Sequence, residues 1–131
     1  MCPKKFDVIV VGDYCLDLIF SGIPELPVLG TEVISSGLTM IPGGAYNTVT
    51  ALHRLGVRVG WAGDFGNDEF STIVLQNARE EHLDDSLFIR HAKPYRNITA
   101  AVSTGEDRAF ITYYDQMPAL PAGLKALTVA S

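Results

Sequence analysis

The hydrophobic pattern divides the chain into short strands that alternate with helices. Phe6–Val11 is a continuous apolar, β-branched run ended by Gly12, which predicts a strand buried on both faces. Tyr46–Leu55 repeats apolar residues at helical spacing and stops before Gly56, a residue type common just past a helix end. Val57–Trp61 alternates from there, so a second strand follows the helix directly.

The second half of the chain predicts another helix and a hairpin. Asn67 or Asp68 can cap the helix, and four apolar residues mark one face of it: Phe70, Ile73, Val74 and Ala78. Leu87–Ile89 is a further short strand. Asn97–Val102 and Ala109–Tyr114 alternate with period two on either side of a loop containing glycine, which predicts a β-hairpin.

A second group of strands interrupts this α/β series. Leu16–Phe20 is a short apolar stretch, and Val33–Ile41 alternates weakly, with a turn-rich segment between them. Together with the late hairpin, they predict a small β-sheet flap, made from residues about 18–41 and 96–115, beside a core of mainly parallel strands. Leu124–Ser131 resembles the opening of another buried strand, so we expect a fragment of a longer chain.

Composition excludes several classes of protein. The chain has 131 residues, of which 47% are hydrophobic and 19% charged, as in one globular domain. A net charge of −5 without a basic stripe argues against a nucleic-acid partner. The apolar run Val8–Val11 is too short for a signal segment or a membrane span. Two cysteines, Cys2 and Cys15, fit a reducing compartment, so we expect a cytoplasmic protein.

One segment is unlike ordinary core. In Pro42–Asn47, the pair Gly43-Gly44 lets backbone approach a ligand, and Asn47 lies on the first turn of the predicted helix. This pattern predicts a ligand cradle at a helix N-terminus; a tight turn before a helix is the structural alternative. Asp17, after the first strand, is similarly open to two readings, as a ligand contact or as a turn cap.

The remaining polar residues favour structural roles. Asp64 and Asp68 are expected to be turn and cap residues, and no acid lies at metal-ligand spacing, so no metal site is expected. The three histidines are widely spaced and are interpreted as surface or interface residues: His53, His82 and His91. The chain has no Gly-x-Gly-x-x-Gly and no Walker A segment, which argues against a dinucleotide or P-loop site.

Three segments, taken in order, resemble the N-terminal part of the ribokinase-like (PfkB) family of carbohydrate kinases. They are Val8-Ile9-Val10-Val11-Gly12 followed by Asp17, then Gly43–Asn47 leading into Ala51–Gly56, and finally Gly63–Asp68. The resemblance implies a ribokinase-like three-layer α/β core with a mainly parallel sheet and a small β-sheet lid. It implies that residues 1–131 are the substrate-binding part, without the C-terminal nucleotide-binding half.

The family resemblance also implies a function. Asp17, Gly43, Gly44 and Asn47 would bind a small carbohydrate that the intact enzyme phosphorylates with ATP and Mg²⁺, and the lid would pair two subunits into a homodimer. The family's catalytic Asp lies in a Gly-Ala-Gly-Asp segment that this chain lacks. We therefore expect no catalytic, nucleotide-binding or metal residue in the chain, and no activity from it alone.

Departures from the family pattern leave the sugar open. Cys15 stands where a polar residue, often Asn, is common, and Asn47 lies one residue closer to the glycine pair than usual. The ligand could be ribose, fructose, a keto-deoxy acid or a nucleoside. The alternative function is a non-catalytic sugar-binding or dimerisation module from a truncated kinase paralogue.

Overall fold

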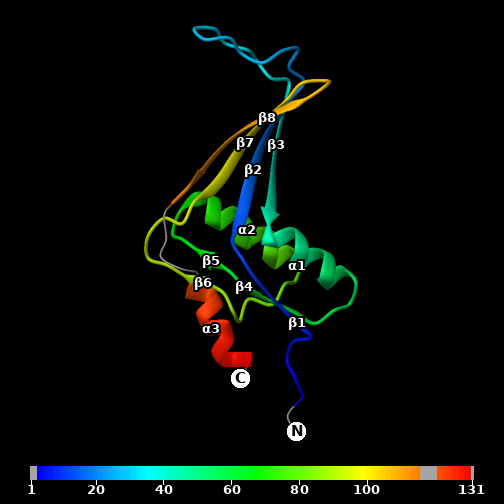
Figure 1. Cartoon of the computed structure of the whole chain (residues 1–131), viewed down its shortest axis with the longest axis vertical. Coiled ribbons are helices and arrows are strands. Elements are labelled where there is room, and N and C mark those ends of the chain that lie inside the picture. Colours follow the sequence, from blue (N-terminus) through cyan, green and yellow to red (C-terminus); the bar gives the residue numbers. More distant parts are fainter. Residues whose placement is uncertain (1–2, 116–120, 131) are drawn as a thin grey trace.

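Two pairs of parallel strands lie at the centre of the computed structural model, which describes residues 3–115 and 121–130. Strand β1 (Val8–Val11) pairs with β4 (Val59–Ala62), and β5 (Asp64–Phe65) pairs with β6 (Ile89–Arg90). These strands form the lower part of the molecule in Figure 1. Short parallel strands need covered faces, which the helices provide.

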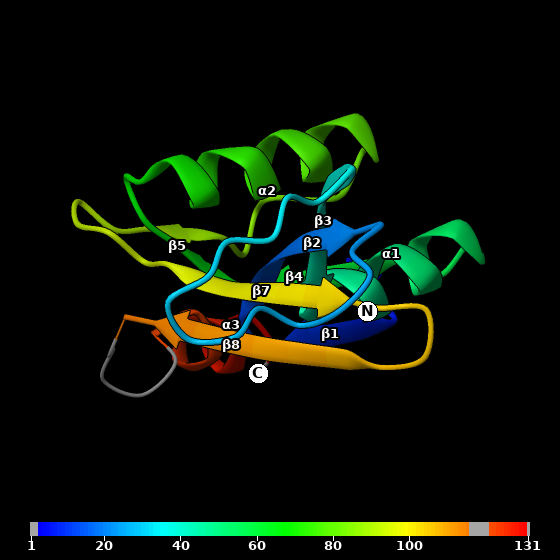
Figure 2. The ribbon, with the colours of Figure 1, turned by 90° about the horizontal axis from the view of Figure 1, so that it is seen from above.

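Helices cover both faces of these strands and so make three layers. Helices α1 (Ala45–Arg54) and α2 (Glu69–Glu80) pack on one side, and α3 (Pro121–Ala130) lies on the side opposite α2, as Figure 2 shows. The larger core cluster, on the α1 and α2 side, is centred on fully buried aromatic and aliphatic side chains: Tyr14, Leu16, Trp61, Phe65 and Val74. A smaller cluster joins Ala122 and Ala126 of α3 to Ala62 and Leu87.

A four-stranded sheet rises from this core, and we call it the lid. Its order is β3 (Gly37–Gly44), β2 (Tyr14–Ser21), β7 (Asn97–Ser103) and β8 (Arg108–Tyr114). Strands β2 and β7 run parallel to each other, whereas β3 is antiparallel to β2 and β8 is antiparallel to β7. Figure 1 shows that the lid extends well beyond the helices, and several large apolar side chains on its strands are exposed: Leu38, Met40, Ile41, Phe110 and Ile111.

Most sequence-predicted elements are confirmed, with small shifts at their ends. The helix predicted at Tyr46–Leu55 is α1, and the predicted hairpin is β7 and β8. The glycine pair is not a free turn: Gly43 and Gly44 are the last residues of β3, and α1 begins at the next residue. The ladder of β2 with β3 therefore delivers the glycines to the start of the helix.

Two sequence predictions are wrong. Leu124–Ser131 is not the opening of a strand, because Leu124–Ala130 belongs to helix α3, while Ser131 lies outside the described residues. Leucine, alanine and lysine favour a helix, and buried alanines four residues apart dock its face on the sheet. The first strand is not buried throughout either. Val8 and Val11 are exposed, because no described strand pairs with the other edge of β1.

Among the described residues, no helix is long and apolar enough to cross a membrane.

Candidate acceptor site

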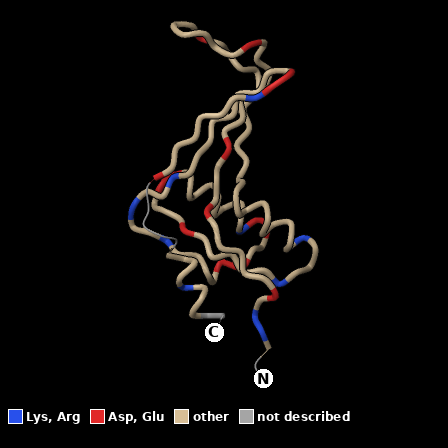
Figure 3. Tube along the Cα trace, in the orientation of Figure 1, with Lys and Arg blue, Asp and Glu red and all other residues tan. Residues whose placement is uncertain are grey.

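The candidate site begins with an acid placed in the lid. Side chains alternate along a strand, so Asp17 and Cys15 of β2 point to the same face. The register puts Asp17 opposite Ile41 of β3 on one side and Thr99 of β7 on the other. Asp17 is the only acidic residue in the four lid strands, and Figure 3 shows how few charged residues these strands carry. A carboxylate in the middle of a sheet costs stability, so its presence here favours a role other than folding.

Gly43 and Asn47 lie beside this carboxylate. Gly43 is buried and pairs with Cys15 across the β2–β3 ladder. A methyl group placed on Gly43 would lie 3.4 Å from Oδ2 of Asp17 and 3.6 Å from Nδ2 of Asn47. The structure therefore brings three of the four sequence-predicted site residues around one point. Glycine at this position leaves room between a carboxylate that accepts hydrogen bonds and an amide that donates and accepts them.

Gly44 does a different job from Gly43. Its φ is +64°, and it is the N-cap residue of α1. A Cβ there would lie 2.7 Å from the carbonyl oxygen of Asp13 and 3.1 Å from the backbone nitrogen of Cys15, so only glycine fits without moving backbone. Gly44 thus shapes the strand-to-helix junction. It makes no side-chain capping bond, and the first turn of α1 contains no acidic residue, which leaves its backbone N–H groups beside the site without a side-chain acceptor.

The carboxylate of Asp17 is held from one side by a thiol. Sγ of Cys15 donates to Oδ1 of Asp17 over 3.3 Å and lies at the same distance from Oγ1 of Thr99. Burial raises the pKa of the Cys15 thiol, and the neighbouring carboxylate adds to the rise, so the thiol keeps its proton. The side chain of Asn47 is exposed and makes no hydrogen bond within the described part of the chain.

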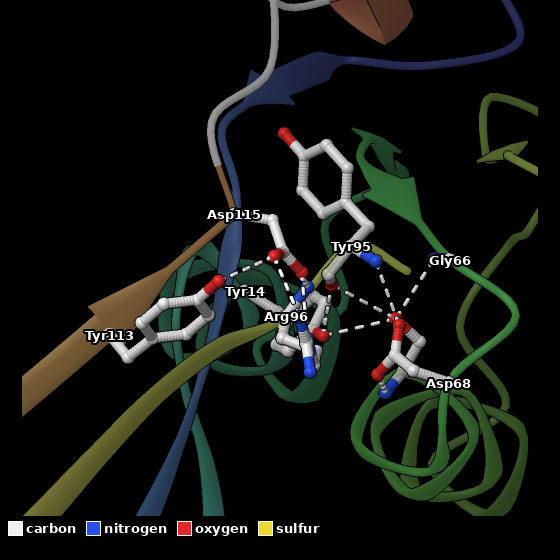
Figure 4. Close-up of polar contacts among 8 residues, drawn as sticks. Tyr14, Gly66, Asp68, Tyr95, Arg96, Tyr113 and Asp115 are labelled. Atoms are coloured by element: carbon white, nitrogen blue, oxygen red, sulfur yellow. Dashed lines mark hydrogen bonds and ion pairs between the residues drawn. The ribbon is translucent and has the colours of Figure 1, made fainter. Parts of the chain in front are cut away.

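The third segment of the family pattern anchors the lid to the core. Asp68 caps α2, as the sequence predicted, by accepting from the backbone nitrogen of Ser71 over 2.9 Å. Its other oxygen accepts from the backbone nitrogen of Tyr95, just before β7, over 2.8 Å. Figure 4 shows this network, in which Tyr14 also donates to the carbonyl of Tyr95. Burial alone would raise the pKa of Asp68, but the hydrogen bonds from Ser71 and Tyr95 outweigh it and lower the pKa.

An ion pair closes the base of the β7–β8 hairpin. Arg96 precedes β7 and Asp115 follows β8, and the two side chains form two hydrogen bonds of 2.9 and 3.0 Å. Tyr113 donates to the same carboxylate (Figure 4), and the guanidinium carbon of Arg96 lies 5.4 Å from the centre of the Tyr113 ring. The Arg96 side chain holds the pKa of Asp115 well below its usual range. The hairpin is thus fixed at its open end next to the Asp68 anchor.

Sequence reasoning missed a second polar cluster at the carboxyl ends of β1 and β4. The sequence predicts Asp64 as a turn residue and His91 as a surface or interface residue, yet Asp64 is 1% exposed and its Oδ1 lies 2.8 Å from Nε2 of His91. The His91 ring stacks on Tyr95, whose hydroxyl donates to Asp13 over 2.7 Å. Burial raises the pKa of Asp13, although the Tyr95 hydroxyl opposes this. The parallel pairing of β5 with β6 makes the contact, and no local signal reports it.

The site presents hydrogen-bonding groups and no metal-ligand cluster within the described residues. The described residues contain no group of three or more His, Cys, Asp or Glu that could hold a metal ion. The groups around Gly43 are a carboxylate, an amide and the backbone carbonyl of Cys15, which can form hydrogen bonds with a polar ligand. A polyphosphate does not fit here, because the carboxylate would repel it and no cation is among these groups.

Comparison with known proteins places the chain in a family. The model of the pfkB family carbohydrate kinases matches residues 5–122. A 2-dehydro-3-deoxygluconokinase from Bacillus subtilis is 36% identical over 61 residues, which cover 47% of this chain and 19% of that protein. The chain therefore spans about a fifth of the length of this relative.

Solved structures agree on the fold. A protein named Sa239 matches 95% of this chain and 42% of its own with a TM-score of 0.78 and 16% identity. A nucleoside kinase of the ribokinase family from Methanocaldococcus jannaschii matches 85% of this chain and 38% of its own, with a TM-score of 0.70 and 18% identity. These likenesses confirm the predicted ribokinase-like α/β fold, of which the chain is a part. Because the family model matches most of its length, the chain belongs to the pfkB family of carbohydrate kinases.

Proposed function

We propose that this chain supplies the acceptor-binding half and the lid of an ATP-dependent kinase for a small carbohydrate. Asp17, Gly43 and Asn47 would bind and orient the sugar, and Gly44 would shape the start of α1 beside it. These roles are positioning roles, in which a fixed geometry lowers the entropic barrier to phosphoryl transfer. The proposal includes a cytoplasmic location, in line with the few cysteines of the chain.

The observation that carries the proposal is the convergence of two polar side chains at Gly43. Oδ2 of Asp17 and Nδ2 of Asn47 lie 3.4 and 3.6 Å from the point where any other residue would place its Cβ. A carboxylate that accepts from two hydroxyls, together with an amide at the same point, suits a polyol. The second oxygen of Asp17 is already held by Cys15, so the free oxygen is the one beside Gly43.

The nucleotide would bind outside these residues. The matched family implies ATP as the phosphoryl donor, and a ribokinase of the same fold from Cryptococcus neoformans was solved in complex with ADP. ATP and Mg²⁺ would supply the transferable phosphoryl group and neutralise its charge. The part played by this chain is to hold the acceptor hydroxyl and, through the lid, to exclude water that would compete as the acceptor.

The lid would also join two subunits. Three of its exposed apolar side chains lie on one face of the sheet, at its two edge strands: Leu38 and Met40 on β3 and Ile111 on β8. A face of this kind is stable in water when a second copy covers it. We propose a homodimer formed through the lid.

The alternative is a sugar-binding or dimerisation module without catalysis. The two functions share the acceptor site and differ in phosphoryl transfer. A coupled assay of ADP release, with the proposed intact kinase, separates them. Sugar binding without ADP release would support the module, whereas sugar-dependent ADP release supports the kinase.

The direct test of the acceptor site is a thermal-shift panel of D-ribose, D-fructose, 2-keto-3-deoxygluconate and adenosine. A bound ligand raises the unfolding temperature by mass action. We expect one compound to do so in the wild type and Asp17→Asn to abolish the shift. Thr39→Val, an exposed substitution on neighbouring strand β3, is the matched control and should keep the shift. A full shift in Asp17→Asn would contradict the acceptor-site assignment.

A further inference from the structure

A line of hydrogen-bonding side chains crosses the lid and ends on Asp17. Thr112 of β8 faces Thr99 of β7, with their hydroxyl oxygens 2.8 Å apart. Thr99 in turn lies 3.3 Å from the thiol of Cys15, and that thiol lies 3.3 Å from Oδ1 of Asp17. The four residues come from three adjacent strands. Thr112 lies directly opposite Thr99, and Thr99 lies directly opposite Asp17 and therefore diagonally across from Cys15.

The direction of these hydrogen bonds follows from counting protons. An ionised carboxylate only accepts, so Cys15 donates its one hydrogen to Asp17. Thr99 must then donate to the sulfur, since the thiol has no second hydrogen. Thr112 must donate to Thr99 for the same reason. All three donors therefore point toward the carboxylate, and hydrogen bonds aligned in this way strengthen one another.

This alignment selects one orientation of the Asp17 side chain. With Oδ1 held by the thiol, Oδ2 is the oxygen that faces the space at Gly43. The Asp17 carboxylate has no other hydrogen-bond partner within the described residues. Without Cys15, the carboxylate would rotate about its side-chain bonds, because an acidic side chain on a strand has several open rotamers.

We propose that Cys15, Thr99 and Thr112 are positioning residues that aim the Asp17 carboxylate at the acceptor sugar. The inference rests on the proposed acceptor site. It adds that the lid hairpin reaches this site through side chains, because Thr99 and Thr112 belong to β7 and β8. A displacement of the hairpin would release the thiol and with it the preferred carboxylate orientation.

The test is the affinity for the panel compound that gives the largest thermal shift, measured by calorimetry on the same protein as the thermal-shift panel. We expect Cys15→Ala to raise the dissociation constant about three- to tenfold, the usual effect of one hydrogen bond. Cys15→Ser keeps a donor and should stay within about twofold of the wild type. Thr99→Val should weaken binding about threefold, and Thr112→Val about twofold, since it lies one bond further away.

Thr39→Val is again the matched control, because the Thr39 side chain is exposed on the same sheet and makes no hydrogen bond in the described part of the chain. It should leave the affinity unchanged. A second readout is the infrared S–H stretch of Cys15. Donation to a carboxylate lowers this frequency, and Thr99→Val should return it part of the way toward that of a free thiol. A merely structural threonine would not move that band.

The outcomes separate this inference from the proposed function. If Asp17→Asn abolishes binding while Cys15→Ala binds as the wild type does, the acceptor site stands and the positioning role of Cys15, Thr99 and Thr112 is wrong. If Asp17→Asn binds normally, both proposals are wrong. A loss of affinity in Cys15→Ala that Cys15→Ser does not restore also contradicts the positioning role, because it points to packing of the sulfur instead of donation.

Discussion

Helices α1 and α2 begin in opposite ways, and the difference separates the site from its support. The N-cap of α2 is Asp68, whose carboxylate is buried and accepts from Ser71 and Tyr95. The N-cap of α1 is Gly44, which offers no side chain at all. A helix N-terminus carries partial positive charge and free N–H groups. In α2 side chains of the protein accept from them, whereas in α1 no side chain does, although the N–H of Ala45 donates to the backbone carbonyl of Asp13.

The two helices end with the same hydrogen-bond pattern but on different residues. In α1, Gly56 donates to the carbonyl of His53 and Val57 donates to that of Leu52, and Gly56 has φ +82°. In α2, His82 takes the corresponding place with φ +57°. This pattern needs a left-handed residue, which glycine adopts at little cost and histidine does not. Helix α1 thus has glycine at its C-terminal turn but no side-chain cap at its N-terminus. Helix α2 has a side-chain cap at its N-terminus but histidine in the left-handed position at its C-terminal turn.

The largest expected effect comes from removing the cap of α2. Asp68→Ala deletes the capping bond and leaves the buried N–H of Tyr95 without its acceptor. We expect the free energy of unfolding, measured by urea denaturation, to fall by about 3 kcal/mol. Asp84→Ala removes instead a half-buried turn acid that accepts from Ser86 and pairs with Lys5, and is the control, with a loss below about 1 kcal/mol. A loss that small in Asp68→Ala would show that the network of Figure 4 contributes little.

The same carboxylate predicts an acid dependence. Its pKa in the folded state is lowered by the Ser71 and Tyr95 hydrogen bonds against the opposing effect of burial. A lowered pKa stabilises the fold above the unfolded value, and this contribution is lost as the pH falls from about 5 through the folded pKa. Wild-type stability should therefore decline more steeply below about pH 5 than that of Asp68→Ala. Parallel curves for the two proteins would rule out this linkage.

Gly44→Ala should have the next largest effect, at the start of α1. Its Cβ would meet the Asp13 carbonyl at 2.7 Å, in a backbone conformation that alanine rarely adopts. We expect a loss of about 2 kcal/mol in the free energy of unfolding. The comparison is with Gly30→Ala, where φ is also positive but no atom lies within 4 Å; there only the backbone cost applies, about 1 kcal/mol. Equal losses would mean that the junction with Asp13 is not tight.

His82→Gly should raise stability at the end of α2. Glycine relieves the left-handed strain, so we expect a gain of about 1 kcal/mol in the free energy of unfolding. The reciprocal change, Gly56→His in α1, should lose a similar amount, since it places a side chain in the same conformation. Thermal denaturation of both variants checks the pair. If both variants were more stable than the wild type, or both less stable, the two helix ends would not share this geometry.

How much of the fold could be predicted depends on whether a feature is set by neighbouring residues in the sequence or by residues far apart in it. Helix α2 and its cap at Asp68 follow from local periodicity and capping chemistry, and the structure confirms both. Helix α3 was misread because a short run of leucine, alanine and valine suits a strand as well as a helix. The Asp64–His91 pair joins residues 27 positions apart, so it depends on how β5 and β6 pair and has no local signature.

The candidate site shows the same limit. The resemblance named Asp17, Gly43, Gly44 and Asn47, but only the ladder between β2 and β3 separates the two glycines by role. Sequence spacing treats them as one pair. In the structure, a Cβ on Gly43 would lie next to the side chains of Asp17 and Asn47, whereas a Cβ on Gly44 would meet backbone atoms of Asp13 and Cys15.

The smallest change in stability should come from Gly43→Ala, which tests this separation directly. The added methyl group lies 3.4 Å or more from every neighbour, an ordinary contact, so we expect the free energy of unfolding to change by less than about 0.5 kcal/mol. The same methyl group occupies the space between Asp17 and Asn47, where the sugar would bind, so the thermal shift with the panel compound should be lost. Gly44→Ala should show the reverse, a large loss of stability with binding retained in the folded fraction. A Gly43→Ala protein that still binds the sugar would place the acceptor elsewhere and leave the open N-terminus of α1 without a ligand.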